Sequence, residues 1–581
     1  MASLGWQELD ILLISGDAYV DHPASGTALL GRWLLKHGYR VGICAQPNWQ
    51  NADGLLAMGR PRLFAGINAG AIDSMLAHYT AFRKKRHDDS NSPGGETGKR
   101  PNRACLVYAN LAKQAFPGLP LILGGIEASL RRLSHYDFWT DSLRKPLLMD
   151  AKADLLLYGM GERSILEVAR RSEAGLPLDG IAGSCWLDSL DQTGRPAHVP
   201  LDMQSLKCLE LPAHEEIEAD AFRLVELTAK LEKQVHNGDC WTFSRVGRRC
   251  VVLAPPAPPL SCSEMDELYG MPFSRRRHPA YKEPVPAEEM LRTSITSHRG
   301  CGGGCSFCSL ALHQGRRICS RSEASILEEA ARLPRLLGRQ GARRLAISDI
   351  GGPTANMWQS RCLLPQDKKC RRKSCCHPGI CKYFHTGQKA CLELLRKAAA
   401  LPGIGQVRVA SGVRPDIGLK ERDCLASYVR EFTGGQLKLA PEHCSEKVLR
   451  LMRKPSLNVF EEMAEIFRRE NRELGRKQYI VPYLMSAFPG CGKEEMQELS
   501  SWLAARGWKP EQVQCFIPTP GTMATAMFYS GRDESGNRIN VARSDAERLE
   551  QHRLLMPQWG NKNAPRKKRS RGVQAWANKS R

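Results

Sequence analysis

The sequence lacks a hydrophobic run of the roughly 18–20 residues that a membrane-spanning helix needs. Its first residues, MASLGWQELDILLIS, lack the basic start and the long apolar stretch of a secretory signal. No acidic residue follows Glu550, and no repeat of solenoid or propeller period occurs. The first two absences predict a cytoplasmic protein with no membrane partner.

The composition is that of a globular protein with an excess of basic residues. The 581 residues include 84 Lys+Arg and 61 Asp+Glu, which gives a formal net charge of +23. Hydrophobic residues make up 42% of the chain and charged residues 25%, so disorder over the whole chain is excluded. This length predicts three or four domains, or fewer large α/β domains.

The 21 cysteines are spread along a chain far longer than a disulfide-stapled secreted domain. Three of them lie between residues 301 and 308, and five lie between 362 and 381. In a reducing compartment, such clusters indicate metal binding or chemistry rather than disulfides.

Residues 1–253 alternate between apolar strands and helical stretches. LDILLISGDAYV is followed by the helical GTALLGRWLLKHGY and a second strand, RVGICAQP, which is the pattern of a βαβ unit. We therefore predict an α/β fold that begins with a doubly wound, Rossmann-like parallel sheet domain. A polar, charged segment near 85–103 is expected to be a long surface loop, and the proline-rich residues 254–289 an extended connector.

Residues 290–530 contain six strand-like pieces that alternate with helical stretches. This pattern predicts a full or partial β/α barrel with its active site at the C-terminal ends of the strands. Residues 531–581 form a C-terminal extension that ends in a basic tail, NKNAPRKKRSRGVQAWANKSR. The tail is expected to be disordered; the alternative is an arm that contacts RNA or DNA through its cations.

The strongest motif is SHRGCGGGCSFC, which holds Cys301, Cys305 and Cys308 in C-x3-C-x2-C spacing. Three thiolates in one short loop can bind a [4Fe–4S] cluster and leave one iron open to a further ligand. The alternatives are a zinc knuckle or three unrelated cysteines. Zinc sites favour paired C-x2-C units and four ligands, and no partner pair lies nearby in the sequence.

With Phe307 before the last cysteine, this motif resembles the signature of the radical S-adenosylmethionine (SAM) superfamily. GDAYVDHP, GGIEASLRRLSHYDFW, SDIGGPTANM, LKLAPEH and FIPTPGTMATAM extend the resemblance, over roughly residues 8–530, to the YgiQ-type radical SAM proteins. The resemblance implies a [4Fe–4S] cluster, SAM as ligand, and reductive cleavage of SAM to a 5′-deoxyadenosyl radical. It also implies an electron donor such as a flavodoxin or a ferredoxin.

The resemblance suggests residues that contact SAM. Gly351 and Gly352 stand where the family has a Gly-Gly-Glu-Pro motif, although the glutamate is absent here. Ser411 and Arg414 follow the strand QVRVA and are expected to reach the ribose or the carboxylate of SAM. For the glycines, a plain turn between strand and helix is the alternative.

Lys438, Glu442 and His443 lie at the end of LKLAPEH and are the candidate catalytic residues. They would offer a cation, an acid and a titratable base at the mouth of the barrel. A buried ion pair or a strand-end cap explains the same residues equally well.

The N-terminal sheet resembles the cobalamin-binding-like domain of many radical SAM enzymes. The histidine loop of cobalamin binders reads Asp-x-His-x-x-Gly, whereas here Asp21 directly precedes His22 and Gly26 is one residue too far away. We therefore expect His22 to be a loop residue or cap and expect no cobalamin. Glu162, in YGMGER, is expected to begin a helix.

The second group of cysteines is the candidate for a second metal site, formed by Cys362, Cys370, Cys375 and Cys381. Their spacing matches no familiar zinc module. A second iron–sulfur cluster, a structural zinc and reduced free thiols all stay open.

The preferred hypothesis is a radical SAM enzyme that acts on an unidentified substrate. Within it, methylthiotransferase-like modification of RNA or protein is an alternative, because PTPGTMATA is similar to a segment of those enzymes. A non-catalytic iron–sulfur protein that binds nucleic acid through its positive charge is the alternative outside it.

Overall fold

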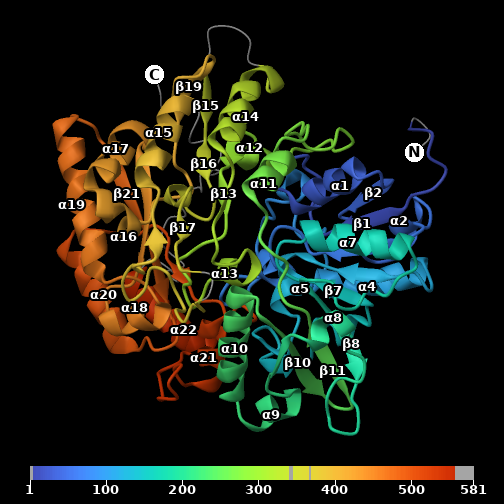
Figure 1. The fold of residues 1–581 in the computed structure, drawn as a ribbon. Coiled ribbons are helices and arrows are strands. Elements are labelled where there is room, and N and C mark those ends of the chain that lie inside the picture. Colours follow the sequence, from blue (N-terminus) through green and yellow to red (C-terminus); the bar gives the residue numbers. More distant parts are fainter. Residues whose placement is uncertain (1–3, 339–343, 366–367, 557–581) are drawn as a thin grey trace.

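The computed structural model describes residues 4–338, 344–365 and 368–556 (Figure 1). One half, blue to green in Figure 1, is built on a single large sheet, and the other, yellow to red, carries the later strands and most of the later helices. The predicted basic tail begins at residue 561, outside the described residues.

The N-terminal sheet has nine strands in the order β2-β1-β3-β4-β7-β8-β11-β10-β9. Their bounds are β1 (Ile11–Ser15), β2 (Val41–Ala45), β3 (Phe64–Asn68), β4 (Leu121–Leu123), β7 (Leu155–Leu157), β8 (Ser184–Ser189), β9 (Lys207–Glu210), β10 (Cys240–Val246) and β11 (Arg249–Leu253). The first five are mutually parallel, and β8 and β11 join them in antiparallel pairing. Strand order reverses between β1 and β3, which is the position where doubly wound sheets bind ligands.

Alternate residues of β1 pack on opposite faces of this sheet, as the period of a strand requires. Ile11 and Leu13 belong to the core beneath α1 (Gly26–Lys36) and α7 (Glu162–Glu173). Leu12 and Ile14 belong to the core on the other face, beneath α4 (Ala104–Ala115). The predicted layered α/β arrangement is therefore present in this half.

The second core contains residues from both ends of the chain. It joins the α4 face of the sheet to α10 (Arg223–Asn237), α21 (Met523–Ser530) and residues 444–555. Tyr136 and Phe528 face each other with ring centroids 5.8 Å apart. In Figure 1 the red α21 lies beside the green α10, to the left of β10 and β11.

The second half contains short parallel strands that alternate with helices. The parallel pairs are β12 with β16, β15 with β19, β20 with β21, and β21 with β22. Their bounds are β12 (Ser294–Thr296), β15 (Leu345–Ile347), β16 (Asp349–Gly351), β19 (Ile404–Val407), β20 (Gln436–Glu442), β21 (Tyr479–Ser486) and β22 (Gln514–Cys515). The intervening helices are α14 (Glu323–Leu336), α15 (Gln388–Ala399), α17 (Arg422–Phe432), α19 (Leu457–Glu473) and α20 (Lys493–Ala505). This is a partial β/α barrel, so the predicted fold class is confirmed.

Two segments expected to be irregular carry defined structure. Residues 254–289 contain α11 (Cys262–Tyr269), which begins with a capping box at Ser261, and the start of α12 (Pro286–Leu291). In the segment near 85–103, the Arg100 side chain is fully buried and forms ion pairs with Asp17 and Asp89. The predicted domain boundaries themselves stay predictions.

Among the described helices, none is both long enough and apolar enough to cross a membrane.

Candidate functional site

The cysteines of the C-x3-C-x2-C motif lie in a tight loop after β13 (His298–Arg299). The backbone N–H of Cys308 donates to the carbonyl oxygen of Cys305 at 3.1 Å. Burial, and then the charges of Cys305 and Cys301, raise the pKa of Cys308 to about 12. The three half-buried thiols therefore lie near one another, and thiolates there need a positively charged partner.

In the described part of the chain, no three His, Cys, Asp or Glu side chains lie close enough to hold one metal ion. A cubane cluster requires a wider spacing of its ligands than a single ion does, because each cysteine binds a different iron atom. The donor set of three cysteines in a glycine-rich loop fits a [4Fe–4S] cluster with one open iron.

Gly300 fixes the start of this loop. It has a φ of +84°, and a Cβ at this position would lie 2.0 Å from the carbonyl oxygen of Arg317. The next residue, Cys301, donates its backbone N–H to the carbonyl oxygen of Gly315 at 3.1 Å. The cysteine loop and residues 315–317 are therefore in direct backbone contact.

Four residues meet at the C-terminal end of β16, beside His298. Ser411 donates to Oδ1 of Asp349 through both its backbone N–H and its hydroxyl, each at 3.0 Å. A Cβ at Gly351 would lie 2.7 Å from Ser411 Oγ, and one at Gly352 would lie 2.5 Å from the carbonyl oxygen of His298. Burial raises the pKa of Asp349 to about 6. The two glycines are therefore packed closely against Ser411 and His298, and the carboxyl group of Asp349 lies beside them.

Arg414 lies over the glycine-rich loop. Its Nη1 is 2.5 Å from the place that a Cβ of Gly303 would occupy. Its Nε and Nη2 donate to the two carboxylate oxygens of Asp416 at 3.1 and 2.5 Å. The charge of Cys305 also acts on Arg414, so the guanidinium is held beside the cysteine triad.

Glu442 is buried close to the triad. Its Oε1 lies 3.7 Å from Nζ of Lys454, and its charge acts on the thiol of Cys308. Burial raises the pKa of Glu442, while the positive charges of Lys454 and Arg414 oppose that rise. A buried ion pair beside the cysteines fits these contacts.

Lys438 and His443 lie apart from Glu442. Lys438 is exposed, and its charge acts on Asp349. His443 is fully buried, with Nδ1 accepting the backbone N–H of Ser445 at 3.0 Å and Nε2 lying 3.5 Å from Sγ of Cys491. Burial lowers the pKa of His443 to about 4. The structure thus brings Glu442 to the triad, Lys438 to Asp349, and His443 into the core.

The second group of cysteines gathers around Cys375. Burial chiefly raises the pKa of Cys375 to about 11, and the charges of Cys370, Cys362 and Cys381 add to the rise. The backbone N–H of Cys381 donates to the carbonyl oxygen of Cys375 at 2.8 Å. Four cysteines that are well separated in the sequence are therefore neighbours.

This group packs against the first cysteine loop. The backbone N–H of Cys375 donates to the carbonyl oxygen of Gly302 at 2.8 Å. The hydroxyl of Ser374 donates to the carbonyl oxygen of Gly303 at 2.5 Å. A Cβ at Gly304 would lie 2.5 Å from the carbonyl oxygen of Lys373, so a side chain there would push the two segments apart.

A buried ion pair joins the N-terminal sheet to the barrel. Glu162, the first residue of α7, accepts a hydrogen bond from Nη1 of Arg299 at 2.5 Å. Nε of Arg299 donates to the hydroxyl of Tyr269 at 2.9 Å. The expected start of a helix at Glu162 is present, and its carboxylate reaches the residue two positions before Cys301.

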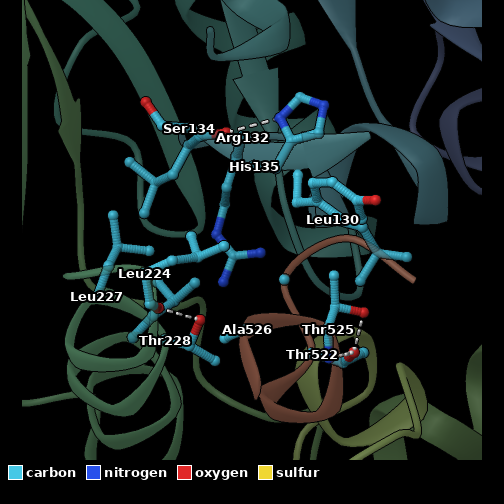
Figure 2. Close-up of a pocket in the computed structure, with 14 residues that line it drawn as sticks. Leu130, Arg132, Ser134, His135, Leu224, Leu227, Thr228, Thr522, Thr525 and Ala526 are labelled. Atoms are coloured by element: carbon cyan, nitrogen blue, oxygen red, sulfur yellow. Dashed lines mark hydrogen bonds between the residues drawn. The ribbon is translucent and has the colours of Figure 1, made fainter. Parts of the chain in front are cut away.

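A small cavity lies between α10, α21 and the segment after α5 (Gly125–Leu130) (Figure 2). Figure 2 shows the guanidinium of Arg132 among Leu224, Thr228 and Ala526. It is fully buried, and its carbon lies 4.6 Å from the ring centroid of Tyr158. The cavity measures about 10 Å³, room for about one water molecule. It is too small for a substrate.

Sequence reasoning missed Asp349, Ser374 and Arg299 as parts of the site. Asp349 precedes the glycines that were singled out, and a carboxylate at a strand end is a signal that was available. Ser374 and Arg299 act through contacts with segments 71 and 137 residues away, which no local pattern reveals.

Comparison with known proteins identifies the family. A family model described as Radical SAM N-terminal matches residues 1–294. A UPF0313 protein of Geobacter sulfurreducens is 46% identical, covering 95% of this chain and 90% of that protein. A UPF0313 protein of Thermotoga petrophila is 42% identical, covering 94% and 95%. The chain belongs to the UPF0313 family.

The matching family model makes this UPF0313 chain a radical SAM enzyme, and the predicted resemblance is confirmed. The non-catalytic alternative is thereby set aside. Among solved structures, the radical SAM methyltransferase TsrM of Kitasatospora setae has a TM-score of 0.50 at 16% identity. The match covers 94% of this chain and 85% of TsrM, and it shows a shared fold.

The expectation that cobalamin is absent was wrong. The solved TsrM structure of the same fold is described with cobalamin and a [4Fe–4S] cluster bound. The expectation rested on the spacing around His22, and one loop does not decide what the fold can bind. In the UPF0313 chain, His22 is buried and its Nδ1 accepts the backbone N–H of Ala24 at 3.0 Å.

Proposed function

We propose that this UPF0313 chain holds a [4Fe–4S] cluster on Cys301, Cys305 and Cys308 and cleaves SAM reductively. When bound, the cluster supplies one electron to SAM, whose C5′–S bond breaks to give methionine and a 5′-deoxyadenosyl radical that takes a hydrogen atom from the substrate. The observation that carries the proposal is the half-buried, glycine-rich loop that brings Cys301, Cys305 and Cys308 together. A flavodoxin- or ferredoxin-type donor would supply the electron.

The residues at the end of β16 are proposed to bind the methionine part of SAM. The carboxylate of Asp349, beside Gly351 and Gly352, can accept hydrogen bonds from the SAM ammonium group. Ser411 holds Asp349 in place through two hydrogen bonds. Arg414 beside the triad is proposed to meet the SAM carboxylate, and Lys438 and Glu442 stay candidate catalytic residues.

We further infer that Cys362, Cys370, Cys375 and Cys381 bind a second metal centre. Their convergence around Cys375 supports this proposal, and both an iron–sulfur cluster and zinc stay candidates for the centre. Neighbouring cations, including Arg316, lower the cost of forming thiolates there. Such a centre beside the first loop also favours methylthiotransferase-like chemistry as the second candidate function.

The first experiment is anaerobic reconstitution followed by SAM and dithionite, with 5′-deoxyadenosine and methionine measured by chromatography. We expect product from the wild type and none from the Cys301→Ala, Cys305→Ala, Cys308→Ala triple variant. Cys262→Ala, which changes an exposed cysteine outside both groups, is the control and should keep its activity. Cleavage by the triple variant would contradict the site.

The second centre is tested by counting iron and sulfide in the quadruple Cys→Ser variant of Cys362, Cys370, Cys375 and Cys381. Iron should fall from about eight to about four atoms per chain if both centres are [4Fe–4S] clusters. Cys424→Ala, which changes a buried cysteine in α17 outside both groups, is the control and should keep all of its iron. An unchanged metal count in the quadruple variant would mean that the four cysteines are free thiols.

Cobalamin is proposed as a further cofactor on the evidence of the shared fold. The switch point between β1 and β3, where a ligand of this fold lies, is lined by Asp17 and Arg100. We expect corrin absorbance to remain with the protein after incubation with hydroxocobalamin and gel filtration. Protein that elutes without corrin would remove cobalamin from the proposal.

A further inference from the structure

A second, larger cavity of about 250 Å³ lies between the two halves of the molecule. Its walls come from the end of β7, the C-terminal end of α10, the proline-rich residues 256–260, and residues 312–319 after α13 (Leu310–His313). In Figure 1, α13 lies at the junction between the N-terminal sheet and the barrel, above α10. None of the residues proposed to bind SAM lines this cavity.

The polar side of the cavity contains two arginines, and the charges of Cys375, Cys370 and Glu232 act on one of them, Arg316. Arg316 and Arg317 both line it, and in the described part of the chain neither forms an ion pair with a carboxylate. Nη1 of Arg316, Nδ1 of His236 and Oε2 of Glu162 are buried atoms to which the described residues supply no hydrogen-bond partner. Burying polar groups in this way is costly unless something satisfies them.

The rest of the wall is mainly apolar. Pro256, Pro258, Pro259, Leu260 and Leu312 line it. A cavity with an apolar wall and a few convergent polar groups is typical of a site for a small organic ligand. Two arginines at one end of such a cavity match the geometry of a phosphate or a carboxylate, which guanidinium groups bind with paired hydrogen bonds.

The arginine wall is also the support of the cluster loop. Gly315 accepts the backbone N–H of Cys301, and Arg317 lies against Gly300. The side chain of Gln314, another lining residue, accepts the backbone N–H of Gly300 at 3.1 Å. A ligand held by Arg316 and Arg317 would therefore lie next to the backbone segment that supports the first cysteine.

We infer that this cavity binds the anionic end of the substrate, a phosphate or carboxylate group, through Arg316 and Arg317. The inference rests on the proposed function, because it gives that enzyme a substrate class. The competing reading is that Arg316 only neutralises the thiols of Cys375 and Cys370, whose charges also act on it. Arg317 separates the two readings, since it is exposed at the cavity, whereas the charges of the two thiols act on Arg316.

The test is calorimetric titration of the reconstituted protein with inorganic pyrophosphate, and with malonate as the carboxylate probe, at constant ionic strength. We expect saturable binding of at least one probe, weakened at least tenfold by Arg317→Ala and further by Arg316→Ala with Arg317→Ala. Arg163→Ala is the matched control, because Arg163 lines the same cavity but is paired with Glu264 at 2.6 Å. Its affinity should change less than threefold.

Unspecific attraction to the basic chain predicts a different result. Removing two of 84 basic residues would leave the affinity almost unchanged, and that outcome would overturn the inference. Absence of saturable binding by either probe would overturn it as well. SAM cleavage is measured on the same samples: binding without cleavage contradicts the proposed function alone, and cleavage without binding contradicts the cavity assignment alone.

Discussion

The ionisation of Asp349 is expected to affect SAM binding, because its side chain lies in the proposed SAM site. Burial raises its pKa from 3.8 to about 6, while the hydrogen bonds from Ser411 and the charge of Lys438 oppose the rise. The folded protein therefore holds this proton more tightly than the unfolded chain does. The stability from this group is complete below about pH 4 and is lost as the pH rises through about 6.

SAM binding should follow the opposite trend, because only the ionised carboxylate pairs with the ammonium group. Below pH 6, we expect the affinity of the wild type for SAM to rise by about tenfold per pH unit and then to level off. Asp349→Asn should bind weakly and show little pH dependence between pH 5 and 7. Equilibrium dialysis with labelled SAM measures both profiles, and parallel profiles would contradict the role of Asp349.

Residues could be predicted from the sequence where the spacing itself carries the chemistry. Cys301, Cys305 and Cys308 lie within eight residues, so their loop brings them together whatever surrounds it. His443 differs, because its neighbours in LKLAPEH do not indicate which way the ring points. Its contact with Cys491 depends on packing between segments 48 residues apart.

The cysteine-rich insertion is attached to the first cysteine loop by one buried side chain. Ser374 donates to the carbonyl oxygen of Gly303 and accepts the backbone N–H groups of Cys376 and His377 at 3.0 and 2.9 Å. Its hydroxyl thus joins the turn of the insertion to the glycine-rich loop. The insertion and the loop should therefore lose order together.

Ser374→Ala should loosen the insertion without changing any cysteine. It leaves a buried carbonyl oxygen and two N–H groups without this partner, at a cost of about 1–3 kcal/mol in the free energy of unfolding. Limited proteolysis within residues 362–385 should become faster. Ser360→Ala is the matched control, because Ser360 is also buried but its hydroxyl has no hydrogen-bond partner among the described residues. Equal proteolysis of the two variants would contradict the role of Ser374.

Helices and strands could be predicted from the sequence where the hydrophobic pattern was decisive. The apolar run of β1 and the amphipathic α1 and α7 predicted a parallel sheet with helices on both faces. The antiparallel pairing of β8 and β11 was not predicted, because strand direction depends on the connections rather than on the hydrophobic pattern. The capped helix α11 was not predicted, because the prolines around it indicated an extended segment.

At the scale of the molecule, the two halves share one core. Residues of α21 close the face of the N-terminal sheet that carries α4 and α10. Met523, Met527 and Phe528 are fully or almost fully buried there. The region matched by the family model, residues 1–294, therefore lacks part of its own hydrophobic core.

A fragment of residues 1–294 should be much less stable than the whole chain. Loss of three large buried side chains at roughly 1.5–3 kcal/mol each removes about 5–9 kcal/mol of apolar burial. We expect strong binding of a hydrophobic dye and aggregation. A fragment of residues 1–556 keeps α21 and should behave like the full chain. A monomeric fragment 1–294 that melts cooperatively near the temperature of the full chain would contradict this view.

The shared core also means that the N-terminal sheet is completed late during synthesis on the ribosome. The last strand of the N-terminal sheet ends at Leu253, and the last helix that contributes to its core ends at Leu555, about 300 residues later. At roughly 5–20 residues per second, synthesis of that stretch takes about 15–60 s. During this time the α4 face of the nascent sheet lacks the part of its core that α21 supplies. We therefore expect ribosome-associated chaperones to bind the N-terminal half until α21 has emerged.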